Sequence, residues 1–321
     1  MTVSRALSAD PKVSALVTEE TRERVETMAT EMGYTPNLLA RSFATGRTGM
    51  LGLLTFEIGW EPAGRQTEQI LRAADRQDYQ MLMAIAAHRL PQTPLEDQAL
   101  QIDQLIARGV DGLVIRTRGD EGESERIQAA VRERVPVVSY YYPTTNLSGV
   151  VLDLERDYLE ATQHLIRLGH ERIGFMGVWE EKGPVSDKAK GYRQAMDKHG
   201  LPYEFLPFLT IDGRGGYLMG KKLGDRFTAI VCRDDYTAIG LCRGLRESGL
   251  RVPEDVAVVG SGDLDPGAYV TPALTTLAPP YEEIALSAMD LMLQQLKGDD
   301  TPRQVTLRSQ LIVRESCGAS S

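Results

Sequence analysis

The chain has 321 residues, of which 42% are apolar and 25% are charged, and its formal net charge is −9. This length allows two domains of ordinary size and a small appendage, and the composition is typical of a soluble globular protein. No apolar run reaches the length of about eighteen residues that a membrane-spanning helix needs, and no apolar segment near the N-terminus indicates export. The three cysteines and four histidines follow no metal or redox spacing, so we expect a cytoplasmic protein with no metal and no cofactor.

The acidic net charge does not exclude DNA binding, because charge is unevenly distributed along the chain. Phosphate contacts supply most nucleic-acid affinity, which disfavours an acidic DNA-binding segment. Residues 1–48 carry six basic and six acidic groups, and residues 32–48 contain Arg41 and Arg47 but no acid. An acidic body with a neutral-to-basic N-terminal arm is therefore compatible with DNA binding.

The first predicted helix begins after Thr18. Residues 18–21 read Thr-Glu-Glu-Thr, which places an N-cap hydroxyl directly before two acidic residues in the first helical turn. Both features stabilise a helix N-terminus, the first by capping a free amide and the second through the helix dipole.

From residue 50 onward, short apolar runs alternate with longer amphipathic stretches. The runs predict strands at residues 50–56, 80–85, 112–115, 135–140, 150–153, 173–176, 229–232 and 256–260. The stretches predict helices at residues 66–76, 95–108, 123–133, 155–168, 187–199, 217–223, 236–248 and 281–296. The runs hardly alternate in polarity, which is typical of strands buried on both faces, so this order predicts parallel sheets covered by helices.

The number of predicted strands favours two doubly wound lobes over one large sheet. The sequence Pro-Thr-Thr-Asn at residues 143–146 loosens the chain between them. Ligands in open α/β sheets bind beyond the carboxyl ends of the strands. Two such lobes facing each other form a cleft that can close on a small molecule.

Several longer motifs occur in a fixed order along nearly the whole chain. They are Thr-Val-Ser-Arg-Ala-Leu at 2–7, the segment 34–48, Leu-Gly-His-Glu-Arg-Ile-Gly-Phe at 168–175, Thr-Ala-Ile-Val-Cys-Arg-Asp-Asp at 228–235, and the segments 250–256, 271–277 and 311–316. In this order and at this spacing, the chain resembles the LacI/GalR family of bacterial transcription regulators. The resemblance implies a type I periplasmic-binding-protein-like body preceded by a partial helix-turn-helix headpiece and a hinge helix.

The resemblance also implies the domain boundaries. The headpiece is expected at residues 1–33, the hinge helix and linker at 34–48, and the effector-binding body at 49–321. Lobe 1 is expected at about 49–149 plus 278–306, and lobe 2 at about 150–277 plus 307–321, so that each lobe is discontinuous.

The headpiece departs from the family pattern at its start. Family members carry a helix and a tight turn ahead of the Thr-Val-Ser at residues 2–4, so we expect about 15–20 further residues in the natural protein to complete the helix-turn-helix. The connector at residues 8–17 is also longer than usual. A chain that truly began at Met1 would instead act as an effector sensor without an operator of its own.

The resemblance assigns DNA contacts to Thr2, Ser4, Arg5, Asn37, Arg41 and Phe43. Arg5 matches a position that can donate two hydrogen bonds to guanine in the major groove. Phe43 stands where the family usually has a leucine that wedges between base pairs and kinks the DNA. The alternative is that residues 37–43 form a linker helix with Phe43 packed on the body.

The resemblance assigns effector contacts to Trp60, Tyr141, Lys188, Asp234 and Asp263. Lys188 replaces a family arginine and keeps its charge without the planar fork. Asp234 replaces an asparagine. Gly262 stands where a carboxylate is common, which Asp263 can replace only by a shift of one residue. Trp60 and the tyrosines at 140–142 make the predicted cleft aromatic.

Alternatives remain open for three of these residues. Lys188 is otherwise a surface residue of a helix, and Trp60 packs on a neighbouring loop. Asp234 or Asp235 otherwise only caps the following helix.

The function that follows is a repressor-type transcriptional regulator. It would be a homodimer, or alternatively a tetramer, that binds operator DNA and responds to a sugar or related metabolite in the cleft. Lobe closure would order or melt the hinge helices and so couple the cleft to DNA.

The second candidate is the sensor described above, and an exported solute receptor would require a signal peptide. The sequence contains no nucleophile elbow, P-loop, dinucleotide fingerprint or metal cluster, so an enzyme is not expected.

Overall fold

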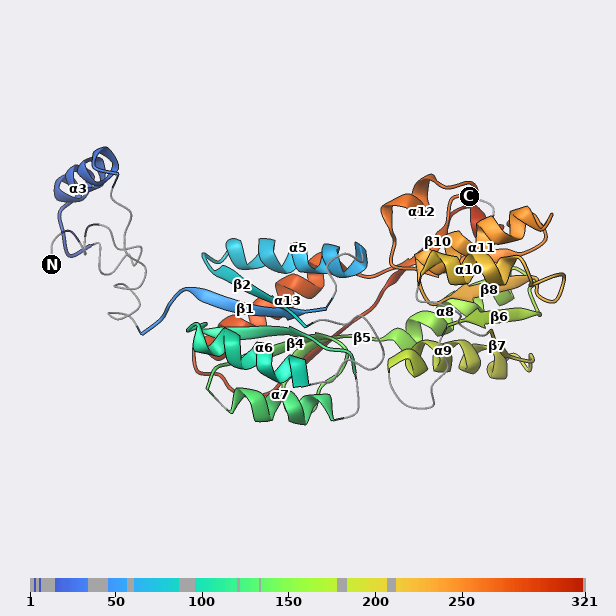
Figure 1. The fold of residues 1–321 in the computed structure, drawn as a ribbon, viewed down its shortest axis with the longest axis horizontal. Coiled ribbons are helices and arrows are strands. Elements are labelled where there is room, and N and C mark those ends of the chain that lie inside the picture. Colours follow the sequence, from blue (N-terminus) through green and yellow to red (C-terminus); the bar gives the residue numbers. More distant parts are fainter. Residues whose placement is uncertain are drawn as a thin grey trace. The chain divides into compact units, whose positions relative to one another are not determined.

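The computed structural model describes residues 3, 6, 15–33, 46–56, 61–86, 96–119, 122–132, 134–177, 184–206 and 212–319. The chain divides into two compact units, Met1–Gly49 and Met50–Ser321, and the second unit is called the body below. Figure 1 shows both and labels the helices and strands for which there is room.

The N-terminal unit contains the helix α3 (Glu19–Glu31). Its N-cap is Thr18, whose side-chain oxygen accepts a hydrogen bond from the Thr21 amide at 3.4 Å. Glu19 and Glu20 occupy the first turn, where the helix dipole favours negative charge. The predicted helix start is therefore confirmed.

The first lobe of the body is built on a six-stranded sheet with the order β11-β5-β4-β3-β1-β2, in which all pairings are parallel. Its strands are β1 (Met50–Thr55), β2 (Gln80–Ile85), β3 (Gly112–Arg116), β4 (Val137–Tyr141), β5 (Ser148–Leu152) and β11 (Gln304–Leu307). The helices α5 (Glu61–Asp75) and α13 (Tyr281–Leu296) cover one face, and α6 (Glu96–Ala107) and α7 (Glu123–Val131) cover the other.

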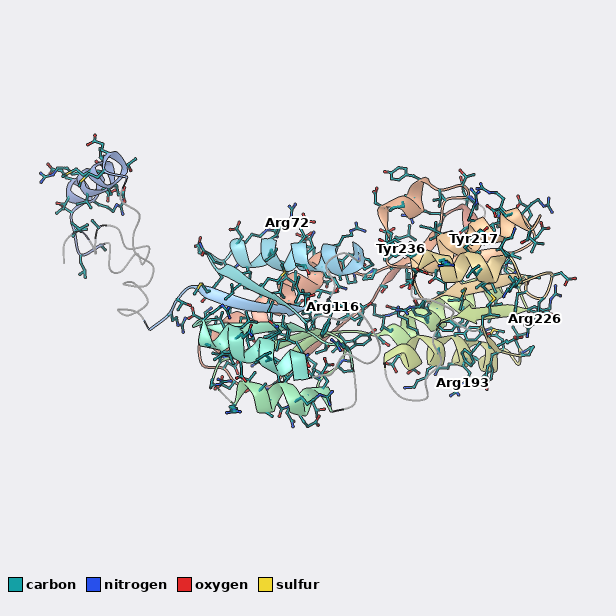
Figure 2. The ribbon with its side chains drawn as sticks, in the orientation of Figure 1. Arg72, Arg116, Arg193, Tyr217, Arg226 and Tyr236 are labelled. Carbon is teal, nitrogen blue, oxygen red and sulfur yellow. The ribbon has the colours of Figure 1, made fainter. Side chains whose placement is uncertain are left out.

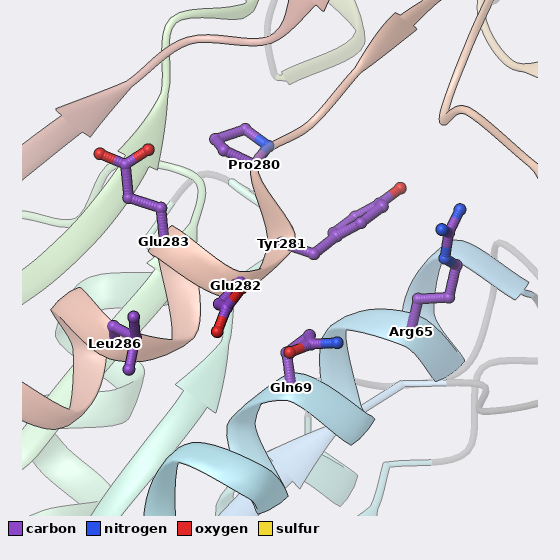
Figure 3. Close-up of a pocket in the computed structure, with 7 residues that line it drawn as sticks. All are labelled: Arg65, Gln69, Pro280, Tyr281, Glu282, Glu283 and Leu286. Atoms are coloured by element: carbon purple, nitrogen blue, oxygen red, sulfur yellow. The ribbon is translucent and has the colours of Figure 1, made fainter.

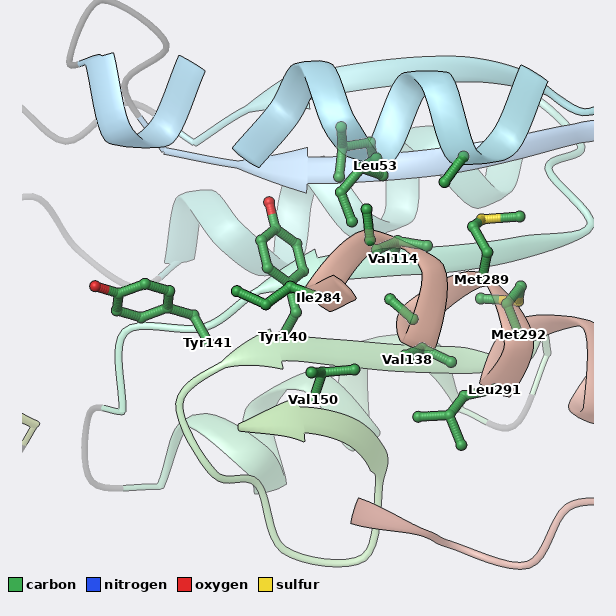
Figure 4. Close-up of a cluster of buried hydrophobic side chains, with 14 of the residues drawn as sticks. Leu53, Val114, Val138, Tyr140, Tyr141, Val150, Ile284, Met289, Leu291 and Met292 are labelled. Atoms are coloured by element: carbon green, nitrogen blue, oxygen red, sulfur yellow. The ribbon is translucent and has the colours of Figure 1, made fainter. Parts of the chain in front are cut away.

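Strand β1 shows why this sheet is buried on both faces. Leu51 and Leu53 pack into the cluster under α5 and α13, whereas Leu54 packs into the cluster under α6 and α7. Successive side chains of a strand point to opposite faces, so a continuous apolar run supplies both cores. Figure 4 shows the first cluster, with Leu53, Val114 and Val138 of three neighbouring strands facing the helices.

The second lobe has its own six-stranded sheet, with the order β12-β10-β9-β8-β6-β7. Its strands are β6 (Ile173–Met176), β7 (Glu204–Leu206), β8 (Ala229–Cys232), β9 (Ala257–Ser261), β10 (Thr275–Ala278) and β12 (Gln310–Ile312), of which β12 alone is antiparallel to its neighbour in the sheet. Helices α8 (Leu154–Arg167) and α9 (Pro184–Lys198) cover one face, and α10 (Gly213–Gly220) and α11 (Asp235–Glu247) cover the other. The predicted pair of doubly wound lobes is confirmed.

The chain passes from one sheet to the other at three places. It crosses at Asp153 between β5 and α8, at Pro279 and Pro280 between β10 and α13, and at Arg308 and Ser309 between β11 and β12. The lobe boundaries expected from the family resemblance put these crossings near residues 150, 277 and 307. Strand β5 therefore belongs wholly to the first sheet, and the first crossing follows it.

Two of the crossings are tied to each other and to α8. The Asp153 amide donates to the Leu307 carbonyl at 3.0 Å. Arg308 pairs with Asp157 and Glu160 of α8, at 3.4 and 2.6 Å, and the Ser309 amide donates to Asp157 at 2.9 Å. Burial raises the pKa of Asp157, although its bonds to Ser309 and the charge of Arg308 oppose that shift.

Candidate functional site

Charged and aromatic side chains of both lobes lie within electrostatic range of one another where strands of the two sheets end. Strand β3 ends at Arg116, β4 ends at Tyr141, and β8 is followed directly by Arg233 and Asp234, while Lys188 comes from α9. We call these five residues the interlobe cluster. The carboxyl ends of parallel strands are where open α/β sheets bind ligands, so the fold places these side chains at the expected edge.

Arg116 and Tyr141 form the first lobe's share of the cluster. Arg116 is only 9% exposed, and its Nε donates to the Gln66 amide oxygen of α5 at 3.0 Å. Its guanidinium carbon lies 4.8 Å from the centroid of the Tyr141 ring, a cation–π distance. In Figure 4 the Tyr140 ring points toward α5, whereas the Tyr141 ring extends past the end of β4. Figure 2 labels Arg116 in the first lobe.

Lys188 is the second lobe's buried cation. It is 9% exposed, and its Nζ donates to the Arg233 carbonyl at 2.9 Å and lies 5.2 Å from the centroid of the Tyr158 ring. The Tyr158 hydroxyl donates to the same carbonyl at 2.7 Å. Burial, followed by the charge of Arg233, lowers the pKa of Lys188 from 10.5 to about 7. The alternative interpretation of Lys188 as a surface residue is therefore wrong.

Asp234 has two bonds within its own lobe. One carboxylate oxygen accepts from the Thr237 amide at 2.8 Å, which makes Asp234 the N-cap of α11. The other lies 3.0 Å from Nε of Arg233. The capping interpretation left open by the sequence thus holds for Asp234, and the same residue also neutralises a cation of the cluster.

Asp235 braces the turn that follows β9. Its carboxylate accepts from the Thr276 hydroxyl at 2.6 Å and from the Leu264 amide at 2.8 Å. Burial raises the pKa of Asp235 from 3.8 to about 6, against the effect of these two hydrogen bonds. A Cβ at Gly260 would lie 2.1 Å from one of the Asp235 oxygens, so the close approach requires glycine there.

The turn at Gly262 and Asp263 of the second lobe accepts hydrogen bonds from the first lobe. Arg65 of α5 donates to the Asp263 carbonyl, and the Tyr281 hydroxyl of α13 donates to the Gly262 carbonyl at 2.9 Å. The Asp263 carboxylate lies 2.7 Å from Nη2 of Arg314 in its own lobe. Gly262 has φ +130°, a conformation that side chains rarely adopt. An acidic residue at position 262 would therefore have a strained backbone, and the carboxylate of the neighbouring Asp263 is bound to Arg314.

A surface pocket of about 500 Å³ lies beside this turn. It is lined by Arg65, Gln69, Pro280, Tyr281, Glu282, Glu283 and Leu286. Figure 3 shows the Arg65 side chain beside the Tyr281 ring, whose centroid is 5.5 Å from the guanidinium carbon. These residues belong to α5 and to the start of α13, so the pocket lies next to the second crossing rather than at the interlobe cluster.

The predicted site residues have different outcomes. Tyr141, Lys188 and Asp234 come together in the interlobe cluster, whereas Asp263 is bound to Arg314. Trp60 and the predicted DNA contacts Thr2, Ser4, Arg5, Asn37, Arg41 and Phe43 lie outside the described residues.

Sequence reasoning missed Arg116, Tyr158 and Arg233 as members of the site. A signal was present for the two arginines, because each directly follows a buried apolar run that was predicted as a strand. Across the described ranges, no three His, Cys, Asp or Glu side chains are grouped as metal ligands. Within the same ranges no helix combines the length and apolar character needed to span a bilayer.

Comparison with known proteins gives matches over the whole chain. Residues 1–37 match the family described as bacterial regulatory proteins, lacI family, and residues 162–317 match the periplasmic binding protein-like domain. The HTH-type transcriptional regulator AscG of Escherichia coli is 30% identical over 330 residues, covering 100% of this chain and 95% of the relative. The ribose operon repressor of Haemophilus influenzae is 26% identical over 312 residues, covering 94% of this chain and 91% of the relative.

Solved structures support the same fold. A lac repressor dimer bound to operator and the anti-inducer ONPF has a TM-score of 0.85 at 22% identity, and the match covers 99% of this chain and 95% of that one. A complex of the transcriptional regulator CelR with cellobiose has a TM-score of 0.72 at 25% identity, with 98% of each chain covered.

Proposed function

This chain belongs to the lacI family of bacterial regulatory proteins and is a transcriptional regulator, and we propose that it is a cytoplasmic repressor whose affinity for operator DNA changes when a small molecule binds at the interlobe cluster. One observation carries the proposal. A lacI-type segment at residues 1–37 precedes a two-lobed body in which charged side chains of both lobes gather at the strand ends.

The contacts between the lobes support a mechanism with two states. Arg65 and Tyr281 of the first lobe bind backbone carbonyls of Asp263 and Gly262 in the second. A ligand that bridges the lobes at the interlobe cluster favours one lobe arrangement over the other by its difference in affinity for the two. In a dimer, the lobe arrangement of the two copies then changes the affinity of their DNA-binding segments for operator DNA. The effector site and the DNA-binding site are thus linked by a coupling free energy.

A dimer is the assembly this mechanism needs, because paired half-sites on DNA match a two-fold axis in the protein. The lac repressor structure that this chain resembles is itself a dimer on operator DNA. A tetramer would add a second dimer without changing the contacts between the lobes of one chain. Sedimentation of the full chain distinguishes a dimer from a tetramer.

The DNA-binding part of the proposal is tested with Phe43→Ala in the full chain. Operator fragments are first selected from random DNA by binding to the wild-type protein. Loss of an apolar wedge should weaken binding to the selected operator about tenfold and leave binding to non-specific DNA unchanged. Tyr269→Ala is the matched control, because Tyr269 is an aromatic residue of the body with 79% exposure.

Equal losses on both DNAs would contradict the wedge. Failure to select any sequence would contradict operator binding by this chain and favour the sensor.

The effector-binding part is tested with Lys188→Ala and Asp234→Ala. A thermal-shift screen of sugars, sugar acids and sugar phosphates identifies a stabilising compound, since a ligand that binds only the folded state raises the melting temperature. Each variant should bind that compound at least about tenfold more weakly, as expected when one charged contact is lost. Lys190→Ala is the control, because Lys190 lies on the same helix and pairs with Asp187 at 2.9 Å. Unchanged affinity in both cluster variants would remove these residues from the site.

A further inference from the structure

Two buried cations of the interlobe cluster lack an acidic partner among the described residues. Arg116 and Lys188 are each 9% exposed, and no described carboxylate lies within 4.0 Å of either. Buried charges in proteins are normally paired, because removing an unpaired charge from water costs several kcal/mol, on the order of the whole stability of a domain. One of the two cations comes from each lobe.

Three other partly buried arginines of the body have carboxylate partners. Arg233 pairs with Asp234 at 3.0 Å and Arg314 with Asp263 at 2.7 Å. Arg308 pairs with Asp157 and Glu160. These arginines have side-chain exposures of 18%, 21% and 33%, so Arg116 is more deeply buried than these three and yet has no carboxylate partner in the ranges that the structure describes.

The contacts of Arg116 fix its guanidinium while leaving its terminal amino groups available. The Nε atom is bound to Gln66, and one face of the guanidinium lies over Tyr141. Within the described part of the chain, Nη1 and Nη2 have no hydrogen-bond partner. A guanidinium held in this way presents the planar fork that binds carboxylate or phosphate oxygens in pairs.

Lys188 is close enough to Arg116 for the two charges to interact. Arg116 is one of the groups that lower the pKa of Lys188, after burial and Arg233, whereas Asp234 and Asp235 raise it. The Asp234 oxygens are bound to Thr237 and Arg233, and the Asp235 oxygens to Thr276 and Leu264. Both carboxylates act on Lys188 from a distance, and neither forms an ion pair with it.

We propose that the effector is a small anion whose carboxylate or phosphate group binds between Arg116 of the first lobe and Lys188 of the second. This inference rests on the proposed effector site and names the chemistry of its ligand. The acidic group supplies the charge that both cations lack, and because it contacts both lobes, it favours their closed arrangement. Tyr141 then covers the part of the ligand next to its acidic group.

The test compares neutral aldohexoses with the matching uronic acids and hexose 6-phosphates, and also compares acetate and inorganic phosphate with chloride at constant ionic strength. Acids of at least one class should raise the melting temperature of the full chain while their neutral parents do not. Arg116→Met should weaken that binding more than about tenfold. Arg72→Met is the control, because the Arg72 side chain is 62% exposed on α5. Arg116→Lys, which keeps the charge but loses the fork, replaces Arg116→Met if that variant does not fold.

A second measurement detects proton uptake by Lys188 when the anion binds. Because the pKa of Lys188 is about 7, an anion placed beside it raises that pKa and causes uptake of up to about one proton at pH 8. The groups facing Lys188 are Tyr158 from α8, Arg116 from β3, and Arg233, Asp234 and Asp235 after β8. Calorimetry in buffers of different ionisation enthalpy should show this uptake for the wild type and not for Lys188→Met.

Two outcomes would overturn the inference. The first is that neutral sugars bind and Arg116→Met leaves their affinity unchanged, which would still leave an effector site in place. The second is that no carboxylate or phosphate compound stabilises the chain relative to chloride. Both measurements are made without DNA, so a failure of operator binding is a separate result that concerns the proposed function alone.

Discussion

Replacing Gly240 with alanine should lower the free energy of unfolding of the body by about 3 kcal/mol. A Cβ at this position of α11 would lie 1.8 Å from the Gly213 carbonyl oxygen and 3.0 Å from the Tyr217 amide of α10. These atoms belong to the backbone, so no side-chain rotation relieves the overlap. The effect should appear even though alanine has a helix propensity about 1 kcal/mol better than glycine.

Moving the two helices apart would break several close contacts at once, because glycines of α10 face α11 in the same way. A Cβ at Gly216 would lie 2.0 Å from the Thr237 carbonyl oxygen, and one at Gly220 would lie 2.6 Å from that of Leu241. Urea unfolding of the full chain, followed by circular dichroism, measures the loss. Gly213→Ala is the control, because its nearest contact would be the Tyr236 carbonyl oxygen at 3.1 Å, and it should cost less than about 1 kcal/mol. Equal values for the two variants would show that the helices separate freely.

Sequence patterns predicted the strands that consist of an apolar run and missed four others, β7, β10, β11 and β12. Strands β2, β6 and β8 have the predicted bounds, and in β6 and β8 every residue is buried. A short apolar run bounded by polar residues is typical of such strands. Three of the missed strands, β7, β11 and β12, consist mainly of half-buried or exposed residues, whereas β10 is buried but begins with two threonines. Their positions depend on the neighbouring strand, which a local pattern does not contain.

The candidate site was predicted in its residue types but not in its partners. The family resemblance led to Lys188 and Asp234 by position in the motif, and both lie in the interlobe cluster. It could not show that Lys188 is buried or that Arg116 lacks a carboxylate, because both facts depend on segments far apart in sequence. Asp263 illustrates the same limit, since Arg314, which binds its carboxylate, is 51 residues away.

Replacing Asp235 with alanine should lower the free energy of unfolding by about 3 kcal/mol, because the change leaves two buried donors without an acceptor. The donors are the Leu264 amide and the Thr276 hydroxyl, which bind the Asp235 carboxylate at 2.8 and 2.6 Å. The turn at Gly262 and Asp263, which contacts the first lobe, would lose its support. Urea unfolding of the full chain measures the loss. Asp153→Asn is the control, because Asp153 is the N-cap of α8 and accepts from the Arg156 amide at 3.1 Å, and asparagine caps a helix as well as aspartate does. Equal losses in the two variants would contradict a bracing role for Asp235.

The conservative variant Asp235→Asn separates the hydrogen bonds of this residue from its charge. An asparagine can accept from the Leu264 amide and donate to the Thr276 oxygen, so it should cost less than alanine. Because burial raises the pKa of Asp235 from 3.8 to about 6, the folded protein holds this proton more tightly than the unfolded chain. The resulting stabilisation is complete below pH 3.8 and is lost as the pH rises through about 6. Relative to the wild type, Asp235→Asn should therefore gain stability between about pH 4 and pH 7. A difference that stays constant over this range would mean that folding does not shift the ionisation of Asp235.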